Sequence, residues 1–130
     1  MKVLLDSGVW WRWVTSQTLR KSLVEFLETE VSEFYLCPVS IMEMFYKIKH
    51  KREPEPEFPD WQNRVLDGFI IAPVSFKAAA KAGSWDWEHG DPCDRLIAAV
   101  AAVDGITLVH NDSKLEKLWG FPQLYFKNVS

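Results

Sequence analysis

The stretch at residues 90–101 reads GDPCDRLIAAVA, and it passes from a turn into an apolar run while carrying two acids, Asp91 and Asp94. Proline is favoured at the first position of a helix and aspartate at the position before it, so a helix is predicted to begin at Pro92. The residues after Asp94 are apolar on every side of that helix, which is typical of a buried helix. We therefore expect a buried helix over residues 92–103 with both carboxylates at its amino-terminal end.

Working outward from this helix, short apolar runs alternate with stretches of helical periodicity. Strands are predicted at residues 2–5, 34–39, 69–74 and 106–110, with an edge strand at 123–129, and further helices at 16–31, 40–52, 60–66, 75–83 and 113–118. The proline-rich segment between residues 53 and 60 is predicted to be a loop. This alternation predicts an α/β domain with a mostly parallel sheet, in which ligands bind at the carboxyl ends of the strands.

The composition limits the class of protein. The chain has 130 residues and a net charge of −3, whereas proteins that coat nucleic acids without specificity are strongly basic. An enzyme that meets nucleic acid at one site is still compatible with this charge. Cys37 and Cys93 lack the spacing of a metal site, and we expect buried, reduced thiols. No signal peptide or membrane span is evident, so we expect a single cytoplasmic domain over residues 1–130 with no membrane contact.

Four acids fall where an α/β sheet has its crevice. Asp6 follows the first strand, Glu43 and Asp94 lie near the starts of two helices, and Asp112 follows a late strand. Four carboxylates in a partly dry cleft would repel one another, so either some are protonated or a cation lies among them. An all-oxygen ligand set favours Mg²⁺ or Mn²⁺, and histidine and cysteine are too sparse for a zinc site.

Each acid also has a purely structural explanation. Asp6 and Asp112 suit turns or caps, Asp91 suits the N-cap of the helix at Pro92, and Glu43 forms a capping-box pattern with Ser40. Residue patterns alone leave both explanations open.

Taken together, the segments that carry these acids resemble the PIN domain family, and within it the ribonuclease toxins of bacterial toxin–antitoxin modules, the VapC type. The matching segments are VLLDSGVWW at 3–11, VSIMEM at 39–44, HGDPCDRLIAAVA at 89–101 and GITLVHND at 105–112. The third segment is the specific one, and the order and approximate spacing agree over nearly the whole chain. HND stands where TRD is common in the family, which leaves Asp112 in place.

The resemblance implies a three-layer α/β/α fold with a mostly parallel central sheet. It also implies a metal-dependent endoribonuclease, the toxin of a toxin–antitoxin system, that cleaves RNA phosphodiesters with a water activated by Mg²⁺ or Mn²⁺. Carried over to this chain, the catalytic and metal-binding acids are Asp6, Glu43, Asp94 and Asp112.

Three further residues are expected beside these acids. Ser7 is expected to orient Asp6 or to contact a bound water, and Asp91 matches an additional acid of the toxin-type segment. Arg95 is expected to pair with a neighbouring acid, which is also what a buried arginine does for purely structural reasons. His89 and His110 are alternative proton carriers, although a lone histidine is more often a local hydrogen-bonding group.

The chain also contains candidate contacts to RNA and to other proteins. The one dense basic run provides Lys47, Lys49, Lys51 and Arg52 for an RNA backbone, although basic residues in a last helical turn also favour the helix dipole. The clustered tryptophans are expected to fill the core or an interface. The resemblance implies a cognate antitoxin protein as partner, and we expect a homodimer.

Two other classes of function compete with the nuclease. The first is a catalytically inactive PIN-like protein-interaction module in which the acids serve only as caps. The second is a phosphoacceptor signalling domain, which would need an aspartate after the strand FIIAPV, and that strand ends without one.

Overall fold

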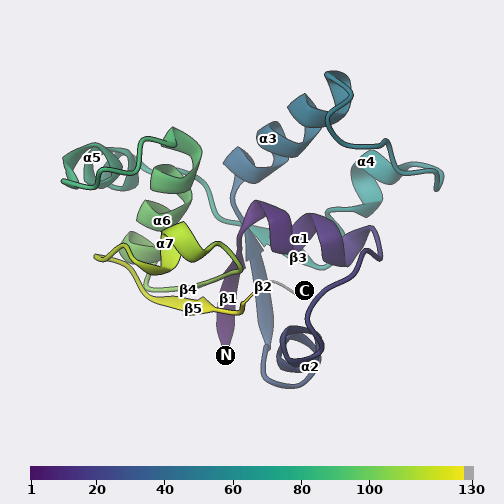
Figure 1. The fold of residues 1–130 in the computed structure, drawn as a ribbon, viewed down its shortest axis with the longest axis horizontal. Helices are drawn as coiled ribbons and strands as arrows, with labels where there is room; N and C mark the ends of the chain where they lie inside the picture. Colours follow the sequence, from purple (N-terminus) through teal and green to yellow (C-terminus); the bar gives the residue numbers. More distant parts are fainter. Residues whose placement is uncertain (128–130) are drawn as a thin grey trace.

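The computed structural model describes residues 1–127 and contains a five-stranded sheet with helices on both of its faces (Figure 1). Its strands are β1 (Lys2–Leu5), β2 (Glu33–Leu36), β3 (Phe69–Ile71), β4 (Thr107–His110) and β5 (Gln123–Tyr125). They lie in the order β3-β2-β1-β4-β5, and every neighbouring pair is parallel. The predicted parallel α/β sheet is therefore confirmed, and β1 lies at its centre.

The central strand is short and apolar because both of its faces are covered. Leu4 packs on one face with residues of α5 (Phe76–Ser84) and α6 (Pro92–Asp104). Val3 and Leu5 point to the other face, against α1 (Ser7–Val14) and α2 (Lys21–Thr29). The alternation of side chains along a strand thus divides the core into two layers, one on each side of the sheet.

The remaining helices are α3 (Pro38–Lys49), α4 (Trp61–Arg64) and α7 (Ser113–Glu116). α3 contacts both α1 and α6, so it connects the helices of the two layers at the end of the sheet where β1 and β2 finish (Figure 1). The three-layer α/β/α arrangement that the resemblance implies is confirmed. Among residues 1–127, no helix combines the length and the hydrophobicity that crossing a bilayer requires.

The predicted helix at 92–103 is α6, one residue longer than expected. Its last residues are followed by Gly105, whose φ of +67° is the left-handed conformation that commonly ends a helix. α2 begins at Lys21, five residues later than the pattern suggested. The predicted edge strand is present as β5 over residues 123–125 only; residues 126 and 127 follow it, and residues 128 and 129 lie outside the described residues.

The helix α1 was not expected from the sequence. Three tryptophans and two valines give it little intrinsic helix propensity, and tertiary packing compensates. Trp10 and Trp11 are buried, and the indole N–H of Trp10 donates a 2.9 Å hydrogen bond to the carbonyl of Val65. Trp87 is also buried, which confirms a core role for these rings, and Cys37 is buried while Cys93 is only half-buried.

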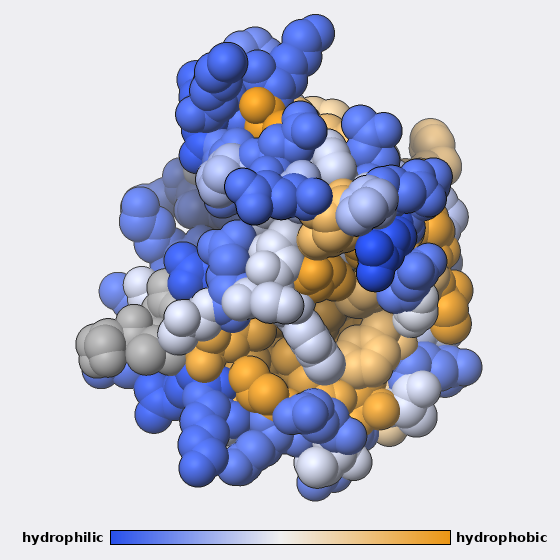
Figure 2. Space-filling model, turned by 90° about the vertical axis from the view of Figure 1, so that its right-hand side faces the viewer, coloured by the Kyte–Doolittle hydropathy of each residue, from blue (hydrophilic) through white to orange (hydrophobic). Residues whose placement is uncertain are grey.

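Apolar side chains also remain at the surface. Figure 2 shows them gathered in a hollow on the side of the molecule that carries α2 and α4. At α1, β2 and β3, the residues Trp13, Val14, Phe34 and Phe69 line a pocket of about 360 Å³. Apolar surface of this kind is typical of sites that contact another protein.

Candidate active site

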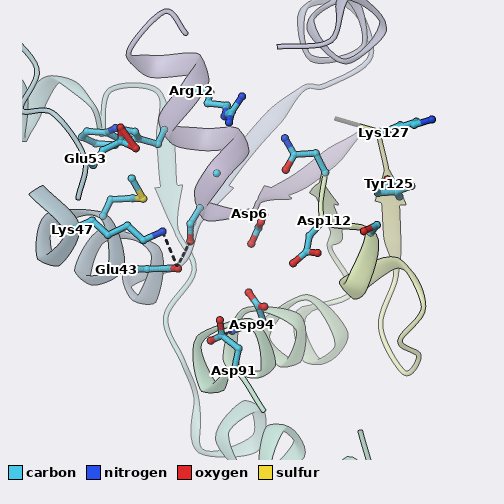
Figure 3. Close-up of a pocket in the computed structure, with 16 residues that line it drawn as sticks. Asp6, Arg12, Glu43, Lys47, Glu53, Asp91, Asp94, Asp112, Tyr125 and Lys127 are labelled. Carbon is cyan, nitrogen blue, oxygen red and sulfur yellow. Dashed lines mark hydrogen bonds and ion pairs between the residues drawn. The ribbon is translucent and has the colours of Figure 1, made fainter. Parts of the chain in front are cut away.

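The four predicted acids converge on one pocket of about 710 Å³ at the carboxyl ends of β1 and β4. Asp6 directly follows β1, Glu43 projects from α3, Asp94 lies in the first turn of α6, and Asp112 follows β4. Figure 3 shows the carboxylates of Asp6, Asp94 and Asp112 pointing toward one another, with Glu43 facing the same space from α3. Residues separated by up to about four fifths of the chain thus share one cleft.

Asp6 is held at the base of this cleft by the sheet itself. Its backbone N–H donates a 3.0 Å hydrogen bond to the carbonyl of Val109, so the pairing of β1 with β4 continues through Asp6. Burial raises the pKa of Asp6 from 3.8 to about 7, and the negative charges of Asp94, Glu43 and Asp112 act in the same direction. A hydrogen bond from the backbone of Ser7 opposes this shift. Burial and the neighbouring acids thus both disfavour the ionised form of Asp6, and a bound cation would favour it.

Asp94 contacts a histidine. Its Oδ2 lies 2.7 Å from Nε2 of His89, which belongs to the loop before α6. Burial raises the pKa of the Asp94 carboxyl, and the hydrogen bond from His89 lowers it. His89 therefore acts as a local hydrogen-bonding partner that fixes one carboxylate oxygen of Asp94.

The capping-box explanation for Glu43 is wrong. α3 begins at Pro38, so Ser40 already lies inside the helix, and its N–H donates to the carbonyl of Cys37. Glu43 instead accepts a 2.7 Å hydrogen bond from the hydroxyl of Ser7, whose oxygen is 2.8 Å from that of Ser40. The predicted contact of the Ser7 side chain is therefore with Glu43, while only its backbone reaches Asp6.

The structural explanations for Asp91 and Asp112 are confirmed. Asp91 is the N-cap of α6 and accepts hydrogen bonds from the backbone of Cys93 and Asp94 at 2.9 and 3.3 Å. Oδ1 of Asp112 accepts from the backbone of Lys114 at 2.9 Å and caps α7. Both side chains nevertheless line the pocket, so capping does not remove them from the acidic cluster.

The expected pairing of Arg95 with an acid is wrong. Its guanidinium donates instead to four backbone carbonyls, those of Ala82, Trp85, Trp87 and His89, at 2.7–3.0 Å. It also lies over the ring of Trp87, 5.5 Å from the centroid. A fork of five N–H donors can satisfy several carbonyls that a loop leaves unpaired, so Arg95 fixes the loop that carries His89.

The basic run divides into two parts. Lys47 lines the acidic pocket and lies 3.8 Å from Glu43. Lys49 is exposed, and Lys51 and Arg52 line a separate depression next to the loop at Pro54. The lining residues missed from the sequence include three charged ones, Arg12, Glu53 and Lys127, and also Tyr125. Nothing in the sequence signals the two on or after β5, because their place depends on the register of β5 against β4.

The donor set fits a hard divalent cation. Within residues 1–127, the ion pairs that involve the four acids are Lys47 with Glu43 and His89 with Asp94, and Asp6 and Asp112 have none. Among residues 1–127, the group whose ligand atoms all lie within 4.8 Å of one another is His89, Asp91 and Asp94, which shares Asp94 with the four acids. Converging carboxylates without matching positive charge are the environment that Mg²⁺ and Mn²⁺ occupy in proteins.

Comparisons with known proteins agree with this fold. A family model described as PIN domain matches residues 3–119. The structure is similar to a chain of VapBC2 from Rickettsia felis bound to a promoter DNA fragment, with a TM-score of 0.73 and 18% identity, covering 96% of this chain and 98% of that chain. The same coverage is found for a toxin-antitoxin complex from Klebsiella pneumoniae (TM-score 0.69, 16% identity) and for DNA-bound VapBC from Salmonella typhimurium (0.67, 20%). No curated protein sequence matches the chain.

Proposed function

Because the chain belongs to the PIN domain family, we propose that it is a metal-dependent endoribonuclease and the toxin component of a VapC-type toxin–antitoxin module. The observation that carries the proposal is the convergence of Asp6, Glu43, Asp94 and Asp112 on one pocket. The similarity of the fold to chains of toxin–antitoxin complexes supports the biological role. The substrate is RNA, and the bond cleaved is a phosphodiester.

Asp6, Glu43 and Asp94 would hold the cation, and Asp112 would complete the set or help to hold a second ion. When bound, Mg²⁺ or Mn²⁺ supplies charge neutralisation for the phosphate and activation of water. The chain's own contribution is to hold the carboxylates in place. Ser7 orients Glu43, and His89 orients Asp94.

The basic side chains around the cleft are suited to hold the RNA backbone. Arg12, Lys47 and Lys127 line the pocket that contains the acids. Lys49, Lys51 and Arg52 extend the positive charge along and beyond the end of α3. Phosphates bound by lysine and arginine release counterions, so this contact gives affinity without sequence specificity.

An antitoxin protein is the proposed partner, and we also propose a homodimer. The similar solved structures include a toxin–antitoxin complex, and the pocket lined by Trp13, Val14, Phe34 and Phe69 offers apolar surface for a protein contact. Induced expression should arrest growth, and co-expression of the antitoxin should restore it. Light scattering on the purified chain tests the dimer, and a monomeric mass at micromolar concentration would contradict it.

A catalytically inactive interaction module is the second candidate, and the capping roles of Asp91 and Asp112 favour it. One assay separates the two candidates. Purified protein is incubated with a pool of cellular RNAs in Mn²⁺, in Mg²⁺ and in chelator, and new 5′ ends are mapped. We expect cleavage that needs the cation and that is lost in Asp94→Asn but kept in Asp86→Asn, an exposed aspartate in the preceding loop. Absence of cleavage by the wild type under all conditions would favour the module.

A further inference from the structure

His110, the last residue of β4, is fully buried although histidine is a polar residue. Within the described part of the chain it is not among the residues that line the acidic pocket. Both of its ring nitrogens have partners, and these partners belong to the two segments that follow β4. The His110 ring therefore does not contact the pocket in which the proposed reaction takes place, and its hydrogen bonds must have another role.

The partners of the ring determine which ring nitrogen donates a hydrogen bond and which one accepts. On one side, the backbone N–H of Asp112 can only donate, and it lies 3.2 Å from Nδ1 of His110. On the other side, the amide nitrogen of Gln123 donates to the carbonyls of Leu118 and Glu116 at 3.0 and 3.4 Å. The amide oxygen of Gln123 therefore faces His110, 2.7 Å from Nε2. These constraints leave a neutral ring with its proton on Nε2.

The consequence for Asp112 is that its main chain and its side chain are held separately. Its N–H is held by His110, and its Oδ1 accepts from the backbone of Lys114 at 2.9 Å. These two hydrogen bonds therefore fix the backbone conformation at Asp112, two residues after the end of β4, where the chain reaches the pocket. Figure 3 shows the Asp112 carboxylate pointing from this turn toward Asp6 and Asp94.

We propose that His110 is a positioning residue that, oriented by Gln123, holds the backbone of Asp112 and so places its carboxylate in the acidic cluster. This inference rests on the proposed role of Asp112 in holding a cation. His110 stands where the family commonly has the threonine of TRD, so the device belongs to this chain's own sequence. Partners that orient metal ligands are typically worth 10–100-fold in cation affinity.

Two substitutions separate the two hydrogen bonds of the ring. His110→Asn keeps an acceptor near the position of Nδ1 and loses the contact to Gln123. His110→Gln keeps a group near Nε2 that can reach Gln123 and loses the acceptor for Asp112. Both variants replace the ring with a neutral amide, and His110→Asn removes one methylene more than His110→Gln, so lost packing alone would affect His110→Asn more. Binding of Mn²⁺ alone to each purified protein is measured by titration calorimetry, and stability is measured by urea unfolding.

We expect His110→Gln to bind Mn²⁺ about 10-fold or more weakly than the wild type, and His110→Asn to stay within about 3-fold of it. Leu27→Val, in the core around α2, controls for lost stability and should leave Mn²⁺ binding unchanged. If His110→Gln does not fold, His110→Leu replaces it, because leucine also lacks an acceptor for the backbone N–H of Asp112. The inference would be overturned if His110→Gln, or the variant that replaces it, bound Mn²⁺ as tightly as the wild type. It would also be overturned if His110→Asn lost as much Mn²⁺ affinity as His110→Gln.

Failure of the proposed function has a different signature. If the wild type binds no Mn²⁺, or if Asp6→Asn binds it as well as the wild type does, the cation site itself is wrong. If the wild type binds Mn²⁺ and Asp6→Asn does not, the cation site stands, and the His110 variants then decide the positioning role alone.

Discussion

The hydroxyl of Ser7 donates a 2.7 Å hydrogen bond to Oε1 of Glu43, across 36 positions of the chain. The bond joins the first residue of α1 to the middle of α3, and the nearby hydroxyl of Ser40 is hydrogen-bonded to the same oxygen of Ser7. Glu43 also lies near Lys47 on the solvent side. The Ser7 hydroxyl is thus the buried contact that sets the direction of the Glu43 carboxylate.

Replacing Ser7 with alanine should weaken Mn²⁺ binding about 10-fold, because the Glu43 carboxylate loses the donor that orients it. Unfolding free energy should fall by only about 1 kcal/mol, the typical worth of one hydrogen bond. Titration calorimetry and urea unfolding measure the two effects. Ser7→Thr keeps the hydroxyl and is the matched control, so equal Mn²⁺ affinities in Ser7→Ala and Ser7→Thr would contradict this role.

The raised pKa of Asp6 makes the cation-free protein less stable as the pH rises. The unfolded carboxyl titrates near 3.8 and the folded one near 7, so between these values the folded state holds the extra proton. Stability must therefore fall as the pH rises through this window, and the loss is complete above pH 7. Asp6→Asn removes the loss and should be more stable than the wild type at pH 8, by roughly 2–4 kcal/mol.

Urea unfolding in chelator at pH 4.5 and pH 8 tests this prediction. The difference in unfolding free energy between Asp6→Asn and the wild type should be larger at pH 8. Glu28→Gln, an exposed acid on α2, is the control and should behave as the wild type at both values. A variant at position 6 that is less stable than the wild type at pH 8 would refute it.

Adding a divalent cation should reverse that instability. A ligand that binds only the folded state stabilises it by about 2.7 kcal/mol at 100 times its Kd, which corresponds to a rise in Tm of about 5 °C or more. Melting curves with increasing Mn²⁺ or Mg²⁺ measure this, and chelator should restore the original Tm. Asp6→Asn and Asp94→Asn should show no such rise, whereas a rise of equal size in these variants would place the cation elsewhere.

Arg95→Lys should destabilise the protein although it keeps the positive charge. Lysine cannot reproduce a planar fork that satisfies the carbonyls of Ala82, Trp85, Trp87 and His89 together. Leaving one or two of these carbonyls unpaired should cost about 2 kcal/mol or more. Urea unfolding measures the cost, and Arg20→Lys, at an exposed position, should change stability by less than about 0.5 kcal/mol.

The basic residues beyond the pocket should act on RNA affinity alone. The double variant Lys51→Ala, Arg52→Ala should raise KM for RNA by about 10-fold near physiological salt and leave kcat unchanged, because it removes two phosphate contacts. The dependence of KM on salt should also become shallower. The control is Lys77→Ala with Lys81→Ala on α5, which makes the same change in charge away from the acidic pocket. Equal effects of the two pairs would mean that only net charge matters.

The parts of the fold that the sequence predicted well have strong local signals. β1 is an apolar run ended by Asp6, and α6 has proline at its first position and glycine after its last residue. α1 lacks such signals, because its tryptophans favour no particular backbone conformation and become helical only by packing under α4 and against the sheet. Local sequence patterns were therefore enough to predict β1 and α6, whereas α1 forms because of tertiary contacts that the local sequence does not reveal.

The site shows the same division. The positions of Asp6, Asp94 and Asp112 follow from where strands and helices begin and end. Glu43 lies in the middle of α3, and only the resemblance of VSIMEM to the family segment singled it out. The partners of Glu43 and Arg95 were predicted wrongly, because Pro38 starts α3 earlier than the capping-box pattern assumed and because backbone carbonyls satisfied Arg95. Which donor meets which acceptor across the fold depends on register and loop path, and neither is encoded in a short segment.

The bond between the Asp6 backbone and Val109 has a consequence for the order in which the protein is made. When only residues 1–90 have been synthesised, the nascent chain contains Asp6 and Glu43. It still lacks Asp94, Asp112 and β4, the strand that pairs beside Asp6. The cleft therefore forms only after residues 107–112 have been synthesised, when β4 inserts next to β1. A product that terminates before β4 keeps three of the four acids, but it lacks Asp112 and the strand that pairs beside Asp6.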